Sequence, residues 1–186
     1  MNFVLQPFDA SKEFIVTPEE IEANKAAVLA FLKKAGIAFD LLEYPPIRTV
    51  AEGEAISEKL GTLCCKCLLM KNRKGGLFLF MLPGAKRFKS GAVAKALGTG
   101  HLSFADETDL AGALHTFPGA VSPMGLLFDT ENRVRFVLDE SVLKTASIDC
   151  HPCHNGASVK MSVADFTQKF LPAAGHAFDA VPMPEE

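Results

Sequence analysis

Residues 63–83, LCCKCLLMKNRKGGLFLFMLP, consist of two apolar runs separated by a short polar segment with two glycines. Two such runs around a glycine-containing turn are typical of a β-hairpin. Side chains along a strand point alternately to its two faces, so Lys66 points to one face and Cys65 and Cys67 to the other. A lysine inside an apolar strand either extends its ammonium to solvent at an edge or lines a cavity.

Helix and strand signals alternate on both sides of this hairpin. Thr17-Pro18-Glu19-Glu20 offers a capping threonine, a proline suited to the first turn and a glutamate that completes a capping box, so a helix begins here and ends at Gly36. Other patterns predict helices at 49–60, 88–98, 106–114 and 162–171, strands at 37–44 and 101–105, a hairpin of 117–129 with 134–140, two short strands within 147–162, and a tail at 177–186.

Interleaved helices and hairpins exclude a purely parallel, doubly wound sheet. We predict a single α/β domain with a mixed, mostly antiparallel sheet and helices packed outside it. The length of 186 residues, 48% of them apolar, suits one domain with a full core. No internal repeat or linker divides the chain, so we expect an N-terminal extension at 1–16 and one domain at 17–186.

The N-terminus has neither the basic start nor the apolar run of a signal peptide. No window approaches the ~20 apolar residues of a membrane span. Five cysteines, an odd number without a secretory signal, indicate a reducing compartment. We therefore expect a cytoplasmic protein that does not associate with membranes.

Positive charge is concentrated in one part of the chain. Residues 59–105 contain nine Lys or Arg and no Asp or Glu, while the remainder holds ten basic and 22 acidic residues, a net charge of −12. Such segregation favours a basic face on an acidic body. This face is either a solvated lysine-rich surface or a binding site for a polyanion.

All five cysteines lie in CCKC (64–67) and CHPCH (150–154). The two clusters have donors for a zinc site, with four thiolates or with His151 or His154 in place of a thiolate. The C-x-x-C spacing also suits a redox pair, and Cys65 with His151 a nucleophilic pair. Because the first cluster lies in an apolar run and a domain of this size folds without metal, core packing of the thiols is favoured, and we expect no metal or other cofactor.

The segment PGAVSPMG (118–125) places Gly119 and Gly125 on either side of Ser122 and Pro123. Such a segment either exposes backbone N–H groups to a carbonyl or developing oxyanion, or forms an ordinary turn before a strand. The sequence lacks the common phosphate-loop, dinucleotide, zinc-protease and serine-hydrolase motifs.

Taken together, five motifs in order resemble the YbaK/ProX family of aminoacyl-tRNA deacylases, free-standing relatives of the editing domain of bacterial prolyl-tRNA synthetase. The resemblance runs from about Ala26 to His176. It rests on CKCLL (65–69), LFLFMLPGAKRFK (77–89), HLSFADETDL (101–110), PGAVSPMG (118–125) and HPCHNGASV (151–159).

The resemblance implies a YbaK/ProX-like fold and a hydrolase whose partner is the acceptor end of misacylated tRNA, with prolyl-tRNA synthetase as a transient partner. It implies that Lys66 is catalytic and stabilises the negative charge that builds on the ester carbonyl oxygen. The implied substrate-binding residues are Cys67, Gly119, Ser122, Pro123, Gly125, His151 and Asn155. The implied tRNA-binding residues are Lys71, Arg73, Lys74, Lys86, Arg87 and Lys89.

The ProX-like branch, which removes alanine from tRNA(Pro), is the most similar. Cys67 stands where the family commonly has asparagine, so Cys- or Ser-tRNA deacylation is an alternative with the same fold. A non-catalytic tRNA-binding module with thiolate-bound zinc is an alternative of a different class.

Overall fold

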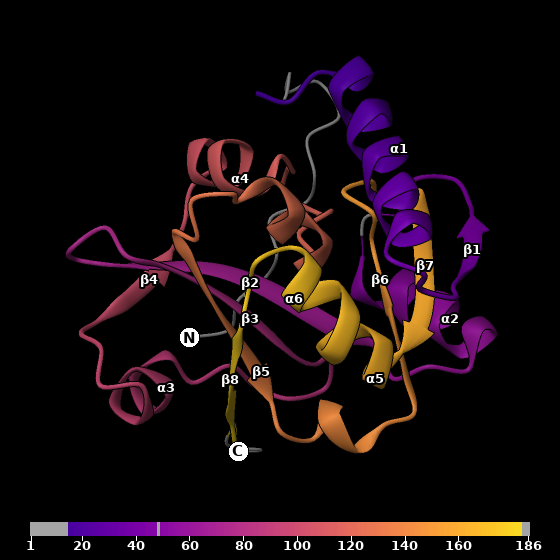
Figure 1. Ribbon diagram of the computed structural model, residues 1–186. Helices are drawn as coiled ribbons and strands as arrows, with labels where there is room; N and C mark the ends of the chain where they lie inside the picture. The colour runs from indigo at the N-terminus through magenta and orange to yellow at the C-terminus, as the bar shows by residue number, and fades with distance from the viewer. Residues whose placement is uncertain (1–14, 48, 184–186) are drawn as a thin grey trace.

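The computed structural model describes residues 15–47 and 49–183, so most of the expected extension at 1–16 lies outside the described residues. The strands form two sheets, one with the order β4-β2-β3-β5-β8 and one with the order β1-β7-β6 (Figure 1). Their bounds are β1 Asp40–Glu43, β2 Cys65–Asn72, β3 Leu77–Pro83, β4 Leu102–Phe104, β5 Val134–Asp139, β6 Ser147–Cys150, β7 Ala157–Ser162 and β8 Phe178–Val181.

The predicted hairpin at 63–83 is confirmed as the centre of the larger sheet. β2 pairs antiparallel with β3, and Lys66 lies opposite Leu82. β4 adds to β2 antiparallel, whereas β5 and β8 extend the other side of the sheet in parallel. The mixed, mostly antiparallel pairing is as predicted, but the strands are divided between two sheets instead of one.

Three helices begin where the sequence predicted them, and the capping box predicted at Thr17 is confirmed. Thr17, Thr49 and Asp106 each accept a hydrogen bond from the backbone N–H three residues later and complete a capping box. The helices are α1 Pro18–Lys34, α2 Val50–Leu60, α3 Ser90–Ala96 and α4 Glu107–Leu114, and a final helical segment combines α5 Val163–Asp165, a π-helical turn Phe166–Phe170 and α6 Leu171–Ala173.

Two segments differ from the prediction. Residues Pro123–Phe128 form a 3₁₀ helix in which the Ser122 hydroxyl accepts from the Met124 N–H, so β5 has no hairpin partner there and pairs with β3. The predicted tail instead contains β8, which pairs with β5. Parallel pairing joins segments far apart in the sequence, so no local turn signal indicates it.

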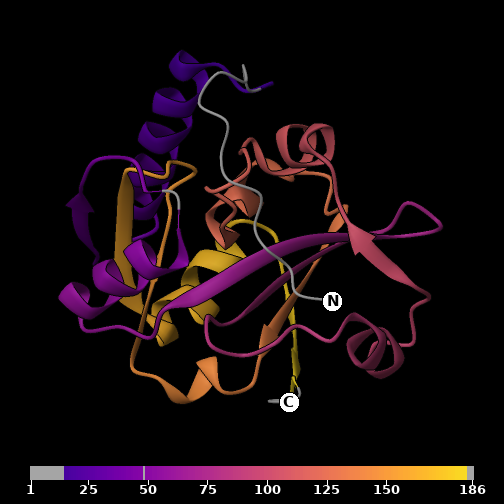
Figure 2. The same cartoon turned by 180° about the vertical axis from the view of Figure 1, so that it is seen from behind.

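The larger sheet is covered on both faces. Leu79 and Met81 of β3 point to the main core, which includes residues of α1, α4, β6 and β7 and therefore joins the two sheets. Phe78 and Phe80 point to a second core beneath α3. The view from behind shows α3 and α4 beside the long β2–β3 hairpin, with the smaller sheet and α1 at its other end (Figure 2).

Candidate active site

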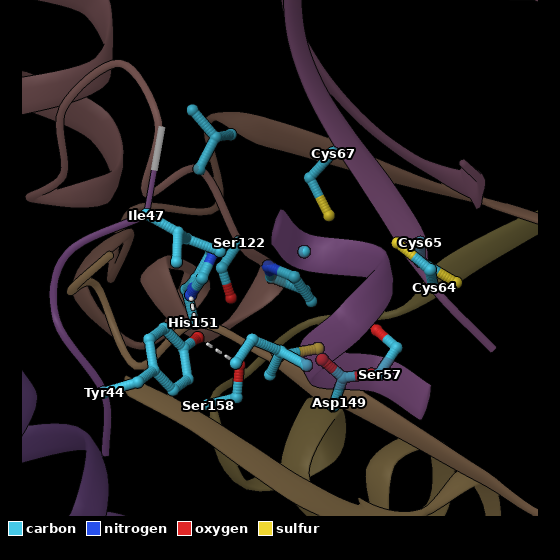
Figure 3. Close-up of a pocket in the computed structure, with 15 residues that line it drawn as sticks. Tyr44, Ile47, Ser57, Cys64, Cys65, Cys67, Ser122, Asp149, His151 and Ser158 are labelled. Carbon is cyan, nitrogen blue, oxygen red and sulfur yellow. Dashed lines mark hydrogen bonds between the residues drawn. The ribbon is translucent and has the colours of Figure 1, made fainter. Parts of the chain in front are cut away.

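A cavity of about 50 Å³ lies where the two sheets meet. Its walls come from α2, the start of β2, residues 121–123, the end of β6 and the start of β7 (Figure 3). Leu63 bridges to Ile148, which holds the chain before β2 beside β6. The two cysteine-containing segments are thereby brought to the same pocket.

Four of the predicted substrate-binding residues line this pocket, namely Cys67, Ser122, Pro123 and His151. The other three lie behind it or beside it. Asn155 donates from Nδ2 to the carbonyl of Ile47, a pocket residue, at 3.0 Å. Gly125 packs against the backbone of Leu114, and Gly119 has a φ of +97°, a backbone conformation that favours glycine.

Lys66 is not among the residues that line the pocket. Its ammonium donates to the carbonyl of Gly84 at 3.0 Å and to the carbonyl of Lys86. The alternation of the strand explains this position, because Cys65 and Cys67 occupy the pocket side. The Gly84 turn is bonded through its N–H to the carbonyl of Cys64, so Lys66 is held beside the segment that borders the pocket.

Burial lowers the pKa of Lys66. A buried ammonium is less hydrated than one in water, so its charge acts more strongly on a neighbouring oxygen. An ammonium has three N–H donors, and the two carbonyls use two of them. The third N–H has no hydrogen-bond partner among the described residues.

Tyr44 is a pocket residue that the sequence analysis did not identify. Its hydroxyl lies 2.7 Å from Ser158 Oγ and 3.3 Å from His151 Nδ1. His151 Nδ1 also lies 2.9 Å from the carbonyl of Ala157, so Nδ1 carries the hydrogen and donates it. Burial lowers the pKa of His151 and raises that of Tyr44 to about 12, so both rings are neutral near pH 7.

The thiols form neutral walls of the pocket. Burial raises the pKa of Cys65 to about 12, and it raises the pKa of Cys67 and Cys150 well above the usual value. A protonated thiol is a poor nucleophile, which argues against Cys65 as an attacking group. In residues 15–47 and 49–183, no three His, Cys, Asp or Glu side chains converge as a metal ion requires.

Asp149 is a second pocket residue that sequence reasoning missed. It is the one side chain with a formal charge among the described residues that line the pocket. Its Oδ1 accepts from Thr62 Oγ1 at 2.5 Å. Asp149 directly precedes the CHPCH cluster, but nothing in its local sequence distinguishes it from an ordinary polar residue of a short strand.

The predicted tRNA-binding residues fall into two groups. Lys71 forms ion pairs with Asp106 and Asp109, and the Lys86 ammonium lies 3.0 Å from the buried carboxylate of Asp139. Lys86 therefore stabilises the fold, whereas the charge of Lys71 is offset by two carboxylates at the surface. The other four are exposed, with Arg73 and Lys74 in the turn between β2 and β3, and Arg87 and Lys89 in the segment between β3 and α3.

Residues 44–169 match the family model of the aminoacyl-tRNA editing domain, so the chain belongs to this family. It is thus an aminoacyl-tRNA editing protein, and the resemblance drawn from the five motifs is confirmed. The prolyl-tRNA editing protein ProX of Acetoanaerobium sticklandii is 31% identical over 158 residues, which cover 84% of this chain and 96% of that protein. The prolyl-tRNA synthetase associated domain-containing protein 1 of Danio rerio is 31% identical over 148 residues, which cover 78% of this chain and 80% of that protein.

A solved structure described as a candidate trans-editing enzyme for prolyl-tRNA synthetase is similar with a TM-score of 0.67 and 20% sequence identity. The similarity covers 88% of this chain and 98% of that chain, and it confirms the α/β fold. Among the described residues, no helix has both the length and the apolar character needed to cross a membrane.

Proposed function

We propose that the protein hydrolyses the ester of misacylated tRNA as an enzyme separate from the synthetase, and that Ala-tRNA(Pro) is its preferred substrate. The small size of the pocket carries this proposal. An apolar cavity of about 150 Å³ accepts a benzene ring, whereas this pocket measures about 50 Å³. A methyl side chain fits such a space, and the larger pyrrolidine ring of proline does not.

The need for such an enzyme follows from the limits of binding selectivity. A synthetase pocket shaped for proline rejects the smaller alanine weakly, because missing methylene groups change binding by only ~1–3 kcal/mol. A second site that admits alanine and excludes proline removes the error. The names of the relatives from Acetoanaerobium sticklandii and Danio rerio, which refer to prolyl-tRNA, support tRNA(Pro) as the carrier.

In the reaction, the oxygen of a water molecule attacks the ester carbonyl carbon. The bond between that carbon and the terminal ribose oxygen then breaks, and the products are the free amino acid and tRNA with its hydroxyl restored. Negative charge builds on the carbonyl oxygen in the transition state. We assign Lys66 to stabilise it, through the N–H donor that Gly84 and Lys86 leave unused.

Burial lowers the pKa of His151, which makes its neutral ring a weaker base for activating water. The family resemblance implies that the neighbouring ribose hydroxyl of the tRNA helps to position the water. His151 and Ser122 then form the wall against which the acyl group rests. We assign the exposed residues Arg73, Lys74, Arg87 and Lys89 to contact acceptor-stem phosphates.

A substrate panel tests the proposal. Purified protein is mixed with Ala-, Ser-, Cys- and Pro-tRNA(Pro), and loss of the acyl group is followed over time. We expect hydrolysis of Ala-tRNA(Pro) and none of Pro-tRNA(Pro) above the rate without enzyme. Faster cleavage of Cys- or Ser-tRNA(Pro) would support the alternative that Cys67 suggests, and no cleavage of any of them would refute the proposal.

The zinc-bound, non-catalytic alternative is tested separately. Elemental analysis of the purified protein measures zinc per chain, and the deacylation assay is repeated after dialysis against a chelator. We expect less than one zinc per chain and an unchanged rate. Stoichiometric zinc together with lost tRNA binding after chelation would favour the alternative.

A further inference from the structure

Among the described residues that line the pocket, a single one carries a formal charge, and that charge is negative. Neutral thiols, hydroxyls and apolar side chains form the rest of the lining together with the neutral His151 ring. The carboxylate of Asp149 lies near Ser57, at a different side of the pocket from Ser122 and Tyr44 (Figure 3). Its charge adds to burial in raising the pKa of Cys64 and of Cys65, the two thiols on the same side of the pocket (Figure 3).

The carboxylate is fixed in position but keeps one oxygen for another donor. Thr62 Oγ1 donates to Oδ1 at 2.5 Å, and in the described part of the chain no hydrogen bond reaches Oδ2. Lys160 lies directly opposite Asp149 in the β6–β7 ladder. Its ammonium, however, donates to the carbonyl of Leu60 at the end of α2. Asp149 therefore has no ion-pair partner among the described residues.

We propose that Asp149 binds the α-ammonium of the aminoacyl ester, so that the enzyme hydrolyses aminoacyl-tRNA with a free amine and spares tRNA whose amine is acylated. This inference rests on the proposed function and defines its substrate class more narrowly. An esterified amino acid has lost its carboxylate charge, so the ammonium is the one charged group that enters the pocket with the acyl chain. A fixed carboxylate with an unused oxygen is the complementary group.

The consequence is a second selection criterion beside size. A peptidyl or N-acetylated amino acid carries a neutral amide that cannot supply a charge to Asp149 and adds bulk to a cavity of about 50 Å³. A site built to bind a charged donor rejects an analogue that lacks it more strongly than an apolar pocket rejects an extra methylene. The enzyme would then act on newly charged tRNA and leave peptidyl-tRNA intact.

The test compares Ala-tRNA(Pro) with N-acetyl-Ala-tRNA(Pro), using wild type, Asp149→Asn, Asp149→Glu and the control Asp165→Asn. Asp165, at the end of α5, is paired with Lys169 of the following π-helical turn and does not line the pocket. Every rate is divided by the rate without enzyme, because N-acylation changes the intrinsic reactivity of the ester. Circular dichroism and thermal melting show whether each variant is folded.

We expect wild type and Asp165→Asn to prefer the free amine by at least about tenfold in kcat/KM. Asp149→Asn should lose most of this preference, through slower cleavage of Ala-tRNA(Pro) with little change for the acetylated substrate, and Asp149→Glu should restore part of it. A folded Asp149→Asn protein that keeps the full preference would overturn the inference and leave the proposed function intact. A wild type that cleaves neither substrate would instead refute the proposed function.

Discussion

Tyr44 directly follows β1, and its hydroxyl links this strand to β7 at the edge of the pocket. The hydroxyl bonds Ser158 of β7 and approaches His151, and Ser158 is only 2% exposed. A buried hydroxyl that loses its partner costs ~1–3 kcal/mol, whereas removal of both partners costs less. Tyr44 is the only tyrosine in the chain, yet nothing in its local sequence predicts that its ring lies in the pocket.

Tyr44→Phe should therefore lower the free energy of unfolding by ~1–3 kcal/mol. Adding Ser158→Ala should cost little more, because the hydroxyl left without a partner is then gone. Chemical denaturation of the two single variants and the double variant measures this coupling. Strictly additive losses in the double variant would show that the two hydroxyls do not depend on each other.

His151 should make stability depend on pH. Burial lowers its pKa in the folded protein, whereas in the unfolded chain it titrates near 6.5. Below about pH 6.5 the unfolded state binds more protons at this residue than the folded state does, so stability falls as the pH is lowered. Well above pH 6.5 the ring is neutral in both states and its contribution to stability no longer changes.

Denaturation at pH 7.5 and pH 5.5 tests this expectation. The loss of stability between the two values should be smaller in His151→Gln than in wild type. The exposed His101 provides the control, and His101→Gln should leave the wild-type loss unchanged. An equal loss in wild type and His151→Gln would contradict the role of burial at His151.

At the scale of elements, the capping boxes and the central hairpin were predictable because they depend on neighbouring residues. The pattern of β2 also predicted correctly that Lys66 and the flanking cysteines lie on different faces. The 3₁₀ segment at Pro123–Phe128 and the parallel strand β8 were not predicted. Both depend on packing against distant elements, which a local pattern does not encode.

The position of the 3₁₀ segment depends on close packing of Gly125 against α4. A Cβ at this position would lie 2.7 Å from the carbonyl oxygen and 2.8 Å from the Cβ of Leu114, which ends α4. Gly125→Ala should therefore destabilise the protein by ~1–3 kcal/mol through overpacking and should displace the adjacent Ser122 wall. Thermal melting and deacylation of Ala-tRNA(Pro) measure the two effects.

Gly112 is the matched control on the same helix. A Cβ there meets nothing within 4 Å, and the glycine lies inside α4. Gly112→Ala should stabilise the protein by ~0.5–1 kcal/mol through higher helix propensity. Similar stability changes at Gly112 and Gly125 would contradict the packing account of the Gly125 segment.

At the scale of the whole molecule, the sequence predicted where positive charge is concentrated but not which charges are paired. Asp139 is 1% exposed and accepts from Lys86 and from the Ser141 N–H. Removing the lysine leaves a buried carboxylate without its cation, which is strongly destabilising. Arg87 is exposed, so its charge is available to a polyanion.

Lys86→Glu should therefore affect stability, whereas Arg87→Glu should affect tRNA binding. We expect Lys86→Glu to lower the melting temperature, and Arg87→Glu to keep it but to weaken tRNA binding and flatten the dependence of binding on salt. Melting curves and binding titrations at two salt concentrations distinguish the two. Unchanged tRNA binding by Arg87→Glu would remove this residue from the proposed phosphate contacts.

Hydrolysis of Ala-tRNA(Pro) in a single turnover, with wild type and Lys66→Ala at saturating enzyme, tests the central claim most directly. Loss of one transition-state donor typically slows an enzyme by about 10²–10³-fold, so we predict at least this loss, with circular dichroism showing a folded variant. Lys66→Ala that is folded and cleaves at the wild-type rate would contradict the account.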